Sequence, residues 1–340
     1  MKAIFKGLAA LVVMFVVSSV NAGTLQDVQK RGYLKCIIST GVAGFAYTDK
    51  TGQWKGFDVD YCRAIAAAVL GDKNKVKFIT STGKTRFTKL ASGAGDVLFR
   101  NSTETIVRDT ALGIQFVGIN FYDGQGFMVK KSLGVKSATE LNGATVCIQS
   151  GTTTELNLAD YFKQQGMKYK PVVIEKNSEA RVLFLKGRCD VYTTDASALA
   201  ATRSTLPSPN NYLVLPEIIS KEPLGPAVRL GDQQWGAVVK WVTNSLVQAE
   251  EFGINSKNIG TFAGSNNPAI QRFLGQSTGI QRANKAMGLD NKWVVRVITQ
   301  IGNYSEIFNR NIGPNTPIGL KRGVNALWTK GGLQYSAPFR

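Results

Sequence analysis

Residues 96–109 have the sequence Asp-Val-Leu-Phe-Arg-Asn-Ser-Thr-Glu-Thr-Ile-Val-Arg-Asp, a short apolar strand followed by a polar turn. A strand that ends in polar groups is how open α/β sheets present ligand-binding side chains at their carboxyl edge. Arg108 lies at the end of the turn, and an arginine can hold a carboxylate through two parallel hydrogen bonds. We therefore hypothesise that Arg108 binds the carboxylate of a small zwitterion; the alternative is an ordinary surface arginine.

Strands and helices alternate on both sides of this stretch. Before it, strands are expected at 33–38 and 76–79, and apolar residues recur at helical spacing behind Asp58, a candidate helix N-cap. After it, residues 116–134 break the pattern, which then resumes. Further strands are expected at 144–148, 172–174, 190–194 and 212–215, and further helices at 150–161, 178–186 and 196–203. This alternation predicts mainly parallel sheets with right-handed crossovers.

The chain has 340 residues, more than one simple core usually accommodates, so two lobes are expected. The second α/β unit lies inside the first. We expect lobe 1 to comprise residues 23–127 and 221–340 and lobe 2 to comprise 128–220, with crossings near 126–130 and 218–225. From residue 233 onward the chain is mostly helical. Clefts between lobes are common ligand sites, and a few linking residues can absorb closure.

The composition argues against several classes of function. Hydrophobic residues make up 44% and charged residues 19% of the chain, as in folded globular proteins. The net charge is +18 and there is no histidine, which removes Ser-His-Asp and Cys-His catalysis and histidine metal sites. No P-loop is present, and we expect no cofactor or metal. Binding to nucleic acid or an anionic surface is one alternative, but the basic residues are scattered and we expect no nucleic-acid partner.

Residues 1–22 have the pattern of a secretory signal peptide. Lys2 and Lys6 precede an apolar run at 8–17, and Val20-Asn21-Ala22 is a small-residue cleavage site. The apolar run is too short to span a bilayer comfortably. Cleavage would remove two lysines and so lower the net charge from +18 to +16. The mature protein is then expected in the periplasm.

Four cysteines allow three pairings, and an exported chain can keep disulfides. Cys36 and Cys62 lie on an early strand and the helix that follows it, whereas Cys147 and Cys189 lie on or beside two later strands. We predict one disulfide in each lobe, Cys36–Cys62 and Cys147–Cys189. A zinc site made of all four cysteines is the alternative, but no C-x-x-C spacing supports it.

Several long phrases resemble a known family. They are Gly-Phe-Asp-Val-Asp at 56–60 with the apolar run to 71, Tyr-Asp-Gly-Gln-Gly-Phe-Met-Val-Lys-Lys at 122–131, and the segments 151–162, 189–195 and 215–229. Together these phrases resemble the polar amino-acid solute-binding proteins of bacterial ABC importers, solute-binding family 3, and most closely the general L-amino-acid-binding subgroup. The resemblance spans nearly the whole mature chain. It implies a two-lobed periplasmic binding protein fold of type II, in the α/β class, with a helical C-terminal extension.

The resemblance also implies a function. The protein is expected to capture L-amino acids between its lobes as a monomer and to deliver them to the membrane permease of an ABC transporter, without being an enzyme. Periplasmic dehydratases and glycan-cleaving lyases share this fold, so an enzyme that uses Glu155 or Asp195 as a general acid or base is the second alternative. No pair of carboxylates in the sequence requires catalysis to explain it. The preferred amino acid and the permease stay open.

Individual residues take roles from the resemblance. Arg108 falls at the family's carboxylate-binding arginine, and Asp195 at the carboxylate that receives the ligand's ammonium group. Asn101 and Thr103 fall at the strand turn that donates hydrogen bonds. Thr153, together with Gly151 and Thr152, falls at a helix start that favours an anion. Two further cleft candidates flank the glycine hinge, Tyr122 and Gln125.

The sequence departs from the family at some positions. Aromatic rings that enclose the ligand side chain in some members are absent near Val42 and Gly83, which favours broad specificity. Arg100 and Lys84 could pair with an acidic side chain and favour glutamate or aspartate; the alternative is that both are solvated. The remaining aromatic residues of interest are expected in the core rather than in the cleft, namely Tyr61, Phe87 and Phe121.

Overall fold

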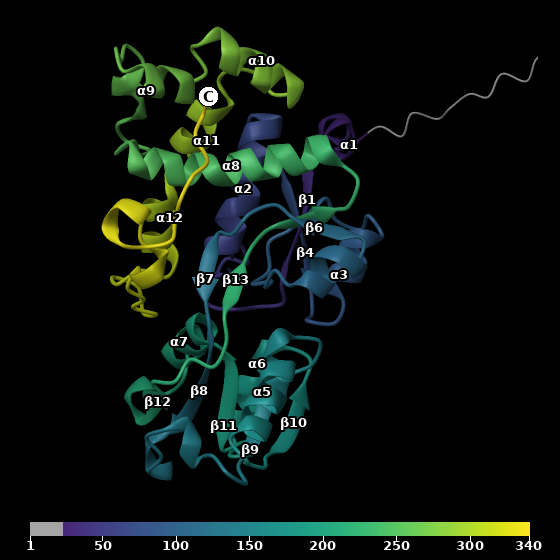
Figure 1. The fold of residues 1–340 in the computed structure, drawn as a ribbon, viewed down its shortest axis with the longest axis vertical. Coiled ribbons are helices and arrows are strands. Elements are labelled where there is room, and N and C mark those ends of the chain that lie inside the picture. The colour runs from purple at the N-terminus through teal and green to yellow at the C-terminus, as the bar shows by residue number, and fades with distance from the viewer. Residues whose placement is uncertain (1–22) are drawn as a thin grey trace, which may run out of the picture.

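The computed structural model describes residues 23–340, and the expected signal peptide, residues 1–22, lies outside the described residues. The chain forms two lobes, one above the other, joined by a narrow passage that contains strands β7 and β13 (Figure 1). Between residues 23 and 340, no helix is both long and apolar enough to span a membrane.

Lobe 1 is built on a five-stranded sheet with the order β4-β1-β5-β14-β6. Strand β1 (Leu34–Ser39) runs parallel to β4 (Val76–Ser81) and to β5 (Val97–Leu98), as the alternation predicted. Strand β14 (Ala227–Arg229) is antiparallel to its two neighbours, β5 and β6 (Ile114–Phe116). The other elements of this part are α1 (Thr24–Arg31), α2 (Phe57–Leu70), α3 (Arg86–Ala91), α4 (Ile106–Ala111) and the hairpin of β2 (Tyr47–Thr48) and β3 (Trp54–Lys55).

Helix α2 begins two residues before the expected position. Its N-cap is Gly56, and the prediction that Asp58 caps the helix is wrong. The backbone at Gly56 has a φ of 128°, and a Cβ there would lie 2.2 Å from the carbonyl oxygen of Phe45. Only glycine fits this close approach of two backbone segments. Asp58 therefore lies inside the first turn of the helix, where it is buried.

Lobe 2 has its own five-stranded sheet, in the order β10-β9-β11-β8-β12. The strands β9 (Thr145–Gln149), β10 (Lys170–Ile174) and β11 (Val191–Asp195) are parallel, and β8 (Gln125–Lys130) and β12 (Tyr212–Val214) complete the sheet with antiparallel pairings. Helices α5 (Thr153–Gln164), α6 (Asn177–Leu185) and α7 (Ala196–Ser204) flank the sheet. One apolar cluster includes Phe127 and Val129, and another includes Met128 and Cys147, as expected for a sheet covered on both faces.

The passage between the lobes is made by β7 (Phe121–Asp123), which pairs antiparallel with β13 (Glu222–Leu224). One crossing was expected at residues 126–130, but these residues belong to β8, where Gln125–Val129 are buried in the second sheet. The glycine at 126 suggested a flexible link, whereas its neighbours pack in the core. We propose that lobe 2 runs from residue 124 to about residue 220.

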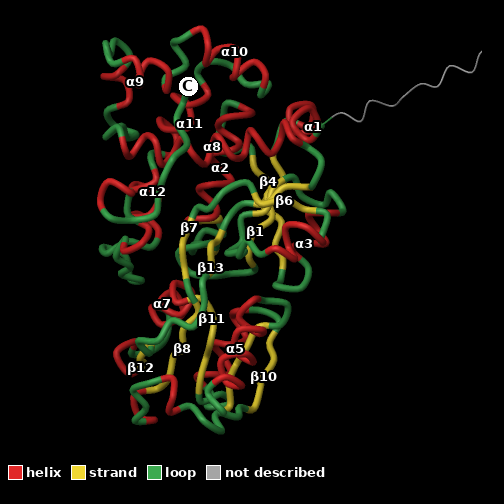
Figure 2. Tube along the Cα trace, in the orientation of Figure 1, coloured by secondary structure: helices red, strands yellow, loops and turns green. Residues whose placement is uncertain are grey.

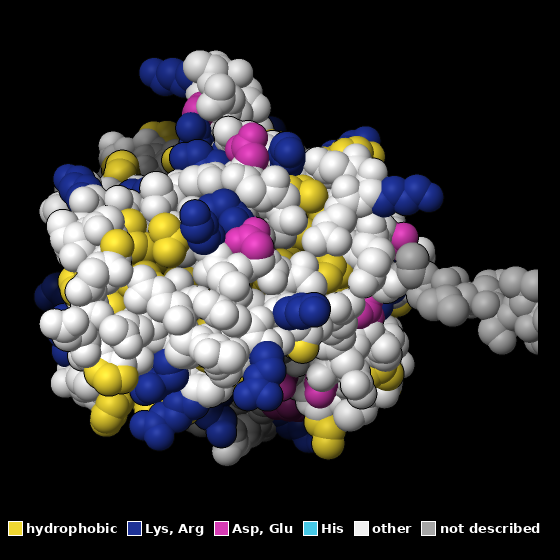
Figure 3. All heavy atoms as spheres, turned by 90° about the horizontal axis from the view of Figure 1, so that it is seen from above, with side chains coloured by type: hydrophobic (Ala, Val, Ile, Leu, Met, Phe, Trp, Pro, Cys, Tyr) yellow, Lys and Arg dark blue, Asp and Glu magenta, His cyan; other side chains and the backbone are white. Residues whose placement is uncertain are grey.

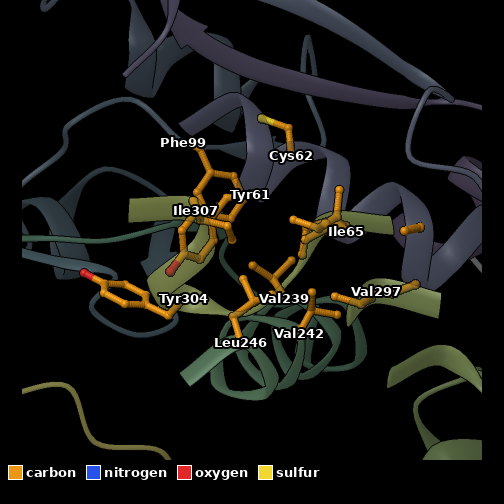
Figure 4. Packing of buried hydrophobic residues seen from close by; sticks show 14 of the residues in the cluster. Tyr61, Cys62, Ile65, Phe99, Val239, Val242, Leu246, Val297, Tyr304 and Ile307 are labelled. Atoms are coloured by element: carbon orange, nitrogen blue, oxygen red, sulfur yellow. The ribbon is translucent and has the colours of Figure 1, made fainter. Parts of the chain in front are cut away.

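The helical C-terminal part completes lobe 1. It contains α8 (Gln233–Glu251), α9 (Pro268–Phe273), α10 (Thr278–Ala286), α11 (Trp293–Ile301) and α12 (Tyr304–Asn311). Helices dominate this end of the molecule, whereas strands gather toward the centre and in lobe 2 (Figure 2). Side chains from α2, α8, α11 and α12 meet in one apolar core, which includes Ile65, Val242, Val297 and Tyr304 (Figure 4). The extension is therefore part of the lobe 1 core.

The last segment of the chain contacts the interlobe passage. The Asn325 side chain accepts a hydrogen bond from the backbone N–H of Tyr122 at 2.7 Å and donates one to its carbonyl at 2.8 Å. Gln334 and Tyr304 also donate to the carbonyl of Asn120, just before β7. The C-terminal segment thus binds one edge of β7, while β13 pairs with the other.

Two sequence predictions about side chains are confirmed. Cys36 is bonded to Cys62 and Cys147 to Cys189, so no free cysteine remains among residues 23–340 to form a zinc site. The aromatic side chains expected in the core are buried, namely Tyr61, Phe87 and Phe121.

Candidate functional site

A small pocket, with a cavity volume of about 30 Å³, lies between the two lobes. Lobe 1 contributes Ser39, Val42, Arg86, Arg100, Asn101 and Thr103, and lobe 2 contributes Gln149, Thr152, Thr153, Thr154, Asn177, Thr194, Asp195 and Ala198. Most of these side chains are polar, so the pocket suits a polar ligand.

The sheet topology brings these residues together. Strands β1 and β5 of lobe 1 end at Ser39 and Leu98, and strands β9 and β11 of lobe 2 end at Gln149 and Asp195. Most pocket residues lie at or shortly after these carboxyl ends, while Arg86 begins α3 after β4 and Asn177 begins α6 after β10. This is the edge where open parallel sheets bind ligands, and here the two edges face each other across the cleft.

The lobe 1 wall carries buried polar atoms without partners. Arg100 is 4% exposed; its Nε donates to the carbonyl of Ser81 at 3.2 Å, but its Nη2 has no partner. Both amide atoms of Asn101 are also buried and unpaired, and this residue has a φ of 38°, in the left-handed region. Buried polar groups without partners are costly. A ligand that bonds to them would remove that cost.

Arg86 is a pocket residue that sequence reasoning missed. It is 2% exposed, its Nη2 donates to the carbonyl of Gly151 across the cleft at 3.4 Å, and its Nε has no partner. Burial lowers the pKa of Arg86 and lowers that of Arg100 to about 10, although nearby carboxylates oppose both shifts. With a pKa of about 10, Arg100 remains a cation at neutral pH.

Arg108, the residue predicted to bind a carboxylate, lies beside the pocket and is not among its lining residues. Its Nη1 donates to the carbonyl of Thr103 at 2.9 Å, and its guanidinium carbon lies 5.1 Å from the centre of the Phe87 ring. Burial lowers the pKa of Arg108, while the charges of Glu222 and Asp195 raise it. The side chain is thus held next to the turn that forms one wall of the pocket.

The lobe 2 wall includes the N-terminus of α5. Thr152 is the N-cap and accepts a hydrogen bond from the backbone N–H of Glu155 at 3.3 Å, while the Glu155 carboxylate accepts from Gly151 at 3.0 Å. Thr152 and Glu155 have the spacing of a capping box, but the carboxylate accepts from the N–H of Gly151 rather than from that of the N-cap residue. Partial positive charge at a helix N-terminus favours an anion. Thr153, at the first helical position, has its hydroxyl at this end of the cleft.

The lobes approach each other closely near Gly151. A Cβ at this residue would lie 3.1 Å from the Cα of Lys84, and a Cβ at Gly83 would lie 2.7 Å from the carbonyl oxygen of Ser150. The missing aromatic ring at Gly83 thus has a structural reason, because no side chain fits there. Lys84 itself is exposed and does not line the pocket.

Asp195 is the last residue of β11 and is 8% exposed. Within residues 23–340 no group donates a hydrogen bond to its carboxylate. Burial raises the pKa of Asp195 well above its usual value, the charges of Asp123 and Glu222 raise it further, and Arg86 and Arg108 oppose them. A cationic ligand group beside this carboxylate would supply the donor that it lacks.

Glu222, on the hinge strand β13, is a second residue that the sequence did not reveal. It is 1% exposed and accepts hydrogen bonds from Thr103 of lobe 1 and, at 2.8 Å, from Thr153 of lobe 2. Asn157 and Ser220 also donate to it, each at 2.7 Å. The carboxylate of Glu222 therefore ties both lobes to the hinge next to the pocket.

The two candidates beside the hinge glycine do not line the pocket. Tyr122 is bound through its backbone to Asn325, and its side chain is partly buried. Gln125 is fully buried behind the pocket wall, where its amide nitrogen donates to the Thr154 carbonyl at 3.0 Å and to the Thr193 hydroxyl at 2.9 Å. Of the predicted site residues, those that line the pocket are Arg100, Asn101, Thr103, Thr152, Thr153 and Asp195.

No group of three or more metal-ligating side chains occurs in the part of the chain that the structure describes. On the face shown in Figure 3, Lys and Arg side chains are dispersed among uncharged residues, with a few acidic side chains between them.

A family model and two relatives each match this chain over most or all of its length. The family model of the bacterial extracellular solute-binding proteins, family 3, matches residues 34–313. The general L-amino acid-binding periplasmic protein AapJ of Rhizobium johnstonii is 53% identical, over 100% of this chain and 99% of its own. The glutamate/glutamine/aspartate/asparagine-binding protein BztA of Rhodobacter capsulatus is 54% identical over the same shares.

Among solved structures, a periplasmic binding protein from Brucella ovis with glutathione bound is 52% identical and superposes with a TM-score of 0.91, covering 94% of this chain and 100% of the other. The ancestral amino acid-binding protein AncCDT-1, a precursor of cyclohexadienyl dehydratase, is 30% identical with a TM-score of 0.57, covering 68% of this chain and 95% of the other. The predicted type II fold is confirmed. The chain belongs to the bacterial extracellular solute-binding proteins of family 3.

Proposed function

We propose that the protein is the periplasmic binding subunit of an ABC importer, which captures L-amino acids between its lobes and delivers them to the permease. The observation that carries this proposal is the pocket itself, with unpaired cationic and amide groups on one side and the Asp195 carboxylate on the other. This arrangement is complementary to a zwitterion. The names of the relatives AapJ and BztA support the same class of ligand.

The α-carboxylate of the ligand would be bound by Asn101 and the N-terminus of α5, with Arg108 beside them, while the hydroxyl of Thr103 donates to Glu222. Its ammonium group would donate to Asp195. These contacts come from both lobes, so the ligand stabilises the closed arrangement over an open one.

Arg86 and Arg100 favour ligands with an acidic side chain. Both are cations in the pocket with an unpaired nitrogen, whereas Asp195 is the one carboxylate among the lining residues. The acidic preference first ascribed to Arg100 and Lys84 is thus better explained by Arg100 and Arg86. The printed name of BztA includes glutamate and aspartate together with their amides, which supports a polar and rather broad preference.

The related structure from Brucella ovis contains glutathione, which is longer than a free amino acid. A longer ligand is therefore a second candidate for the cleft of this protein.

We favour binding over catalysis. The relatives that match nearly the full chain are named as binding proteins. AncCDT-1 is named as the precursor of a dehydratase but is itself described as an amino acid-binding protein. We also propose that the protein acts as a monomer and binds no nucleic acid.

Thermal shifts test the proposal. The mature protein, refolded to remove carried-over ligand, is screened against the twenty amino acids and against the matching amines and des-amino acids. A ligand that binds only the folded state raises the melting temperature. Shifts with several L-amino acids, and none with compounds lacking either α-group, are expected. The absence of a shift with every L-amino acid would contradict the proposal, and turnover of a bound ligand would favour the enzyme.

A further inference from the structure

A second groove continues from the pocket between the lobes. The two spaces share Val42 of lobe 1 and Asn177 of lobe 2 as lining residues. The groove has a cavity volume of about 390 Å³ and is open to solvent. Its full lining is Gly41, Val42, Ala43, Tyr47, Asn177, Ser178, Arg181, Ala201, Thr202 and Thr205. A free amino acid in the pocket would leave this groove empty.

The pocket and the groove meet at Val42 and Asn177, and Gly41 of the groove lining precedes Val42. Val42 is the shared residue on the lobe 1 side, and no atom lies within 4 Å of the position that a Cβ would take at Gly41. The hinge strand contacts the pocket at other residues: the carboxylate of Glu222 accepts hydrogen bonds from Thr103 and Thr153. A ligand whose α-groups are held near Thr103 and Thr153 can therefore extend its other end past Val42 into the groove.

The groove contains one charged side chain among its lining residues, that of Arg181 on α6. Its Nη2 donates to the carbonyl of Thr205 at 2.7 Å, which fixes the guanidinium between α6 and the end of α7. Its Nε is buried and has no partner. The other lining residues are small or polar and uncharged, and Asn177, Ser178 and Thr202 can bond to an amide. Helix α7 lies at the edge of lobe 2 that faces lobe 1 (Figure 1).

We infer that the groove is a second subsite, which takes the distal part of a γ-glutamyl peptide, with Arg181 binding the terminal carboxylate. The inference rests on the proposed function, because the pocket must hold the amino acid end. A γ-linked peptide keeps both the α-carboxylate and the ammonium group of its first residue free. An α-linked dipeptide uses that carboxylate in its peptide bond, so it cannot make the same contacts in the pocket.

Calorimetric titration of the mature protein with L-glutamine, γ-L-glutamylglycine, its C-terminal amide and α-L-glutamylglycine tests the subsite. The wild-type protein should bind glutamine and γ-glutamylglycine, bind the amide about tenfold more weakly, and bind the α-linked isomer far more weakly. In Arg181→Ala, γ-glutamylglycine should lose about tenfold in affinity and become equal to its amide, while glutamine should change less than twofold. Arg188→Ala, at an exposed arginine beyond α6, should behave as the wild type.

The outcomes separate the two proposals. Failure of every free amino acid to bind would overturn the proposed function and the subsite with it. Binding of glutamine without γ-glutamylglycine would overturn the subsite alone. So would equal affinity for the two dipeptide isomers, or a loss in Arg181→Ala that affects glutamine as much as the peptide, because the latter indicates a structural role for this arginine.

Discussion

Two buried polar clusters lie side by side at the lobe interface, and they differ in how completely their atoms are bonded. In the hinge cluster each carboxylate oxygen of Glu222 accepts two hydrogen bonds, from Thr103 and Thr153 and from Asn157 and Ser220. In the pocket the atoms without a partner include Nη2 of Arg100, Nε of Arg86, the whole amide of Asn101 and the hydroxyl of Ser39.

This difference distinguishes the cluster that stabilises the fold from the cluster that binds a ligand. A fully bonded network stabilises the arrangement that it bonds, whereas unpaired buried groups are costly in the protein alone. Such groups persist where another molecule completes them. The hinge cluster therefore holds the lobes in register, and the pocket is complete only when a ligand is present.

The largest effect is expected from removing either of the two charges that we propose to bind the zwitterion. Asp195→Ala and Arg108→Ala should each lower the affinity for L-amino acids by about 2–5 kcal/mol, because each leaves one ligand charge without its partner. Calorimetric titration measures the loss, and Asp160→Ala, an exposed aspartate on α5, is the matched control. Affinity like that of the wild type in Arg108→Ala would mean that Arg86 or Arg100 binds the α-carboxylate instead.

A substitution in the hinge cluster should lower the stability of the protein rather than remove a contact with the ligand. Glu222→Ala removes the acceptor of four donors and should lower the free energy of unfolding of the ligand-free protein by about 2–4 kcal/mol, measured in urea. Asp195→Ala should show no such loss, since no described group donates to that carboxylate. Glu140→Ala, at an exposed glutamate, is the control. Equal destabilisation by the Glu222 and Asp195 variants would remove the distinction between the clusters.

Replacing one pocket arginine should change selectivity. Arg100→Met should weaken glutamate binding by about 1–3 kcal/mol more than glutamine binding, because a charged hydrogen bond to the acidic side chain is lost. Lys84→Met should change neither, since Lys84 is exposed and lies outside the pocket lining. The two affinities are compared by competition titration. If Lys84→Met changed the ratio and Arg100→Met did not, the assignment of the side-chain contact would be reversed.

The sequence predicted the fold and much of the pocket because both depend on local signals. A strand that ends in a polar turn pointed to Asn101 and Thr103, and the resemblance to the family supplied Asp195. The placement of the cysteines identified both disulfides. Gly126 was misleading, since a glycine inside a strand resembles a hinge. Its strand is buried by long-range pairing with β11 and β12, which no local pattern shows.

The residues that the sequence analysis missed are brought to the site by long-range contacts in the fold. Lys84 lies two residues before Arg86, the first residue of α3. Arg86 is buried in the pocket, whereas Lys84 is exposed. Nothing in the local pattern distinguishes them. Glu222 stands between a lysine and a proline in an irregular segment, and its role depends on four donors from three different parts of the chain.

Ligand binding in the pocket should also depend on pH through Asp195. The pKa of Asp195 is raised, chiefly by burial, so its carboxyl keeps its proton to a higher pH than a free aspartate does. The ionised form binds an ammonium group more strongly than the protonated form, so affinity should rise with pH, by up to about tenfold per unit below that pKa, and then level off. Binding below the pKa should release a proton, which titrations in buffers of different ionisation enthalpy detect. Asp195→Asn should bind more weakly without the slope, and a slope retained in that variant would assign the proton to another group.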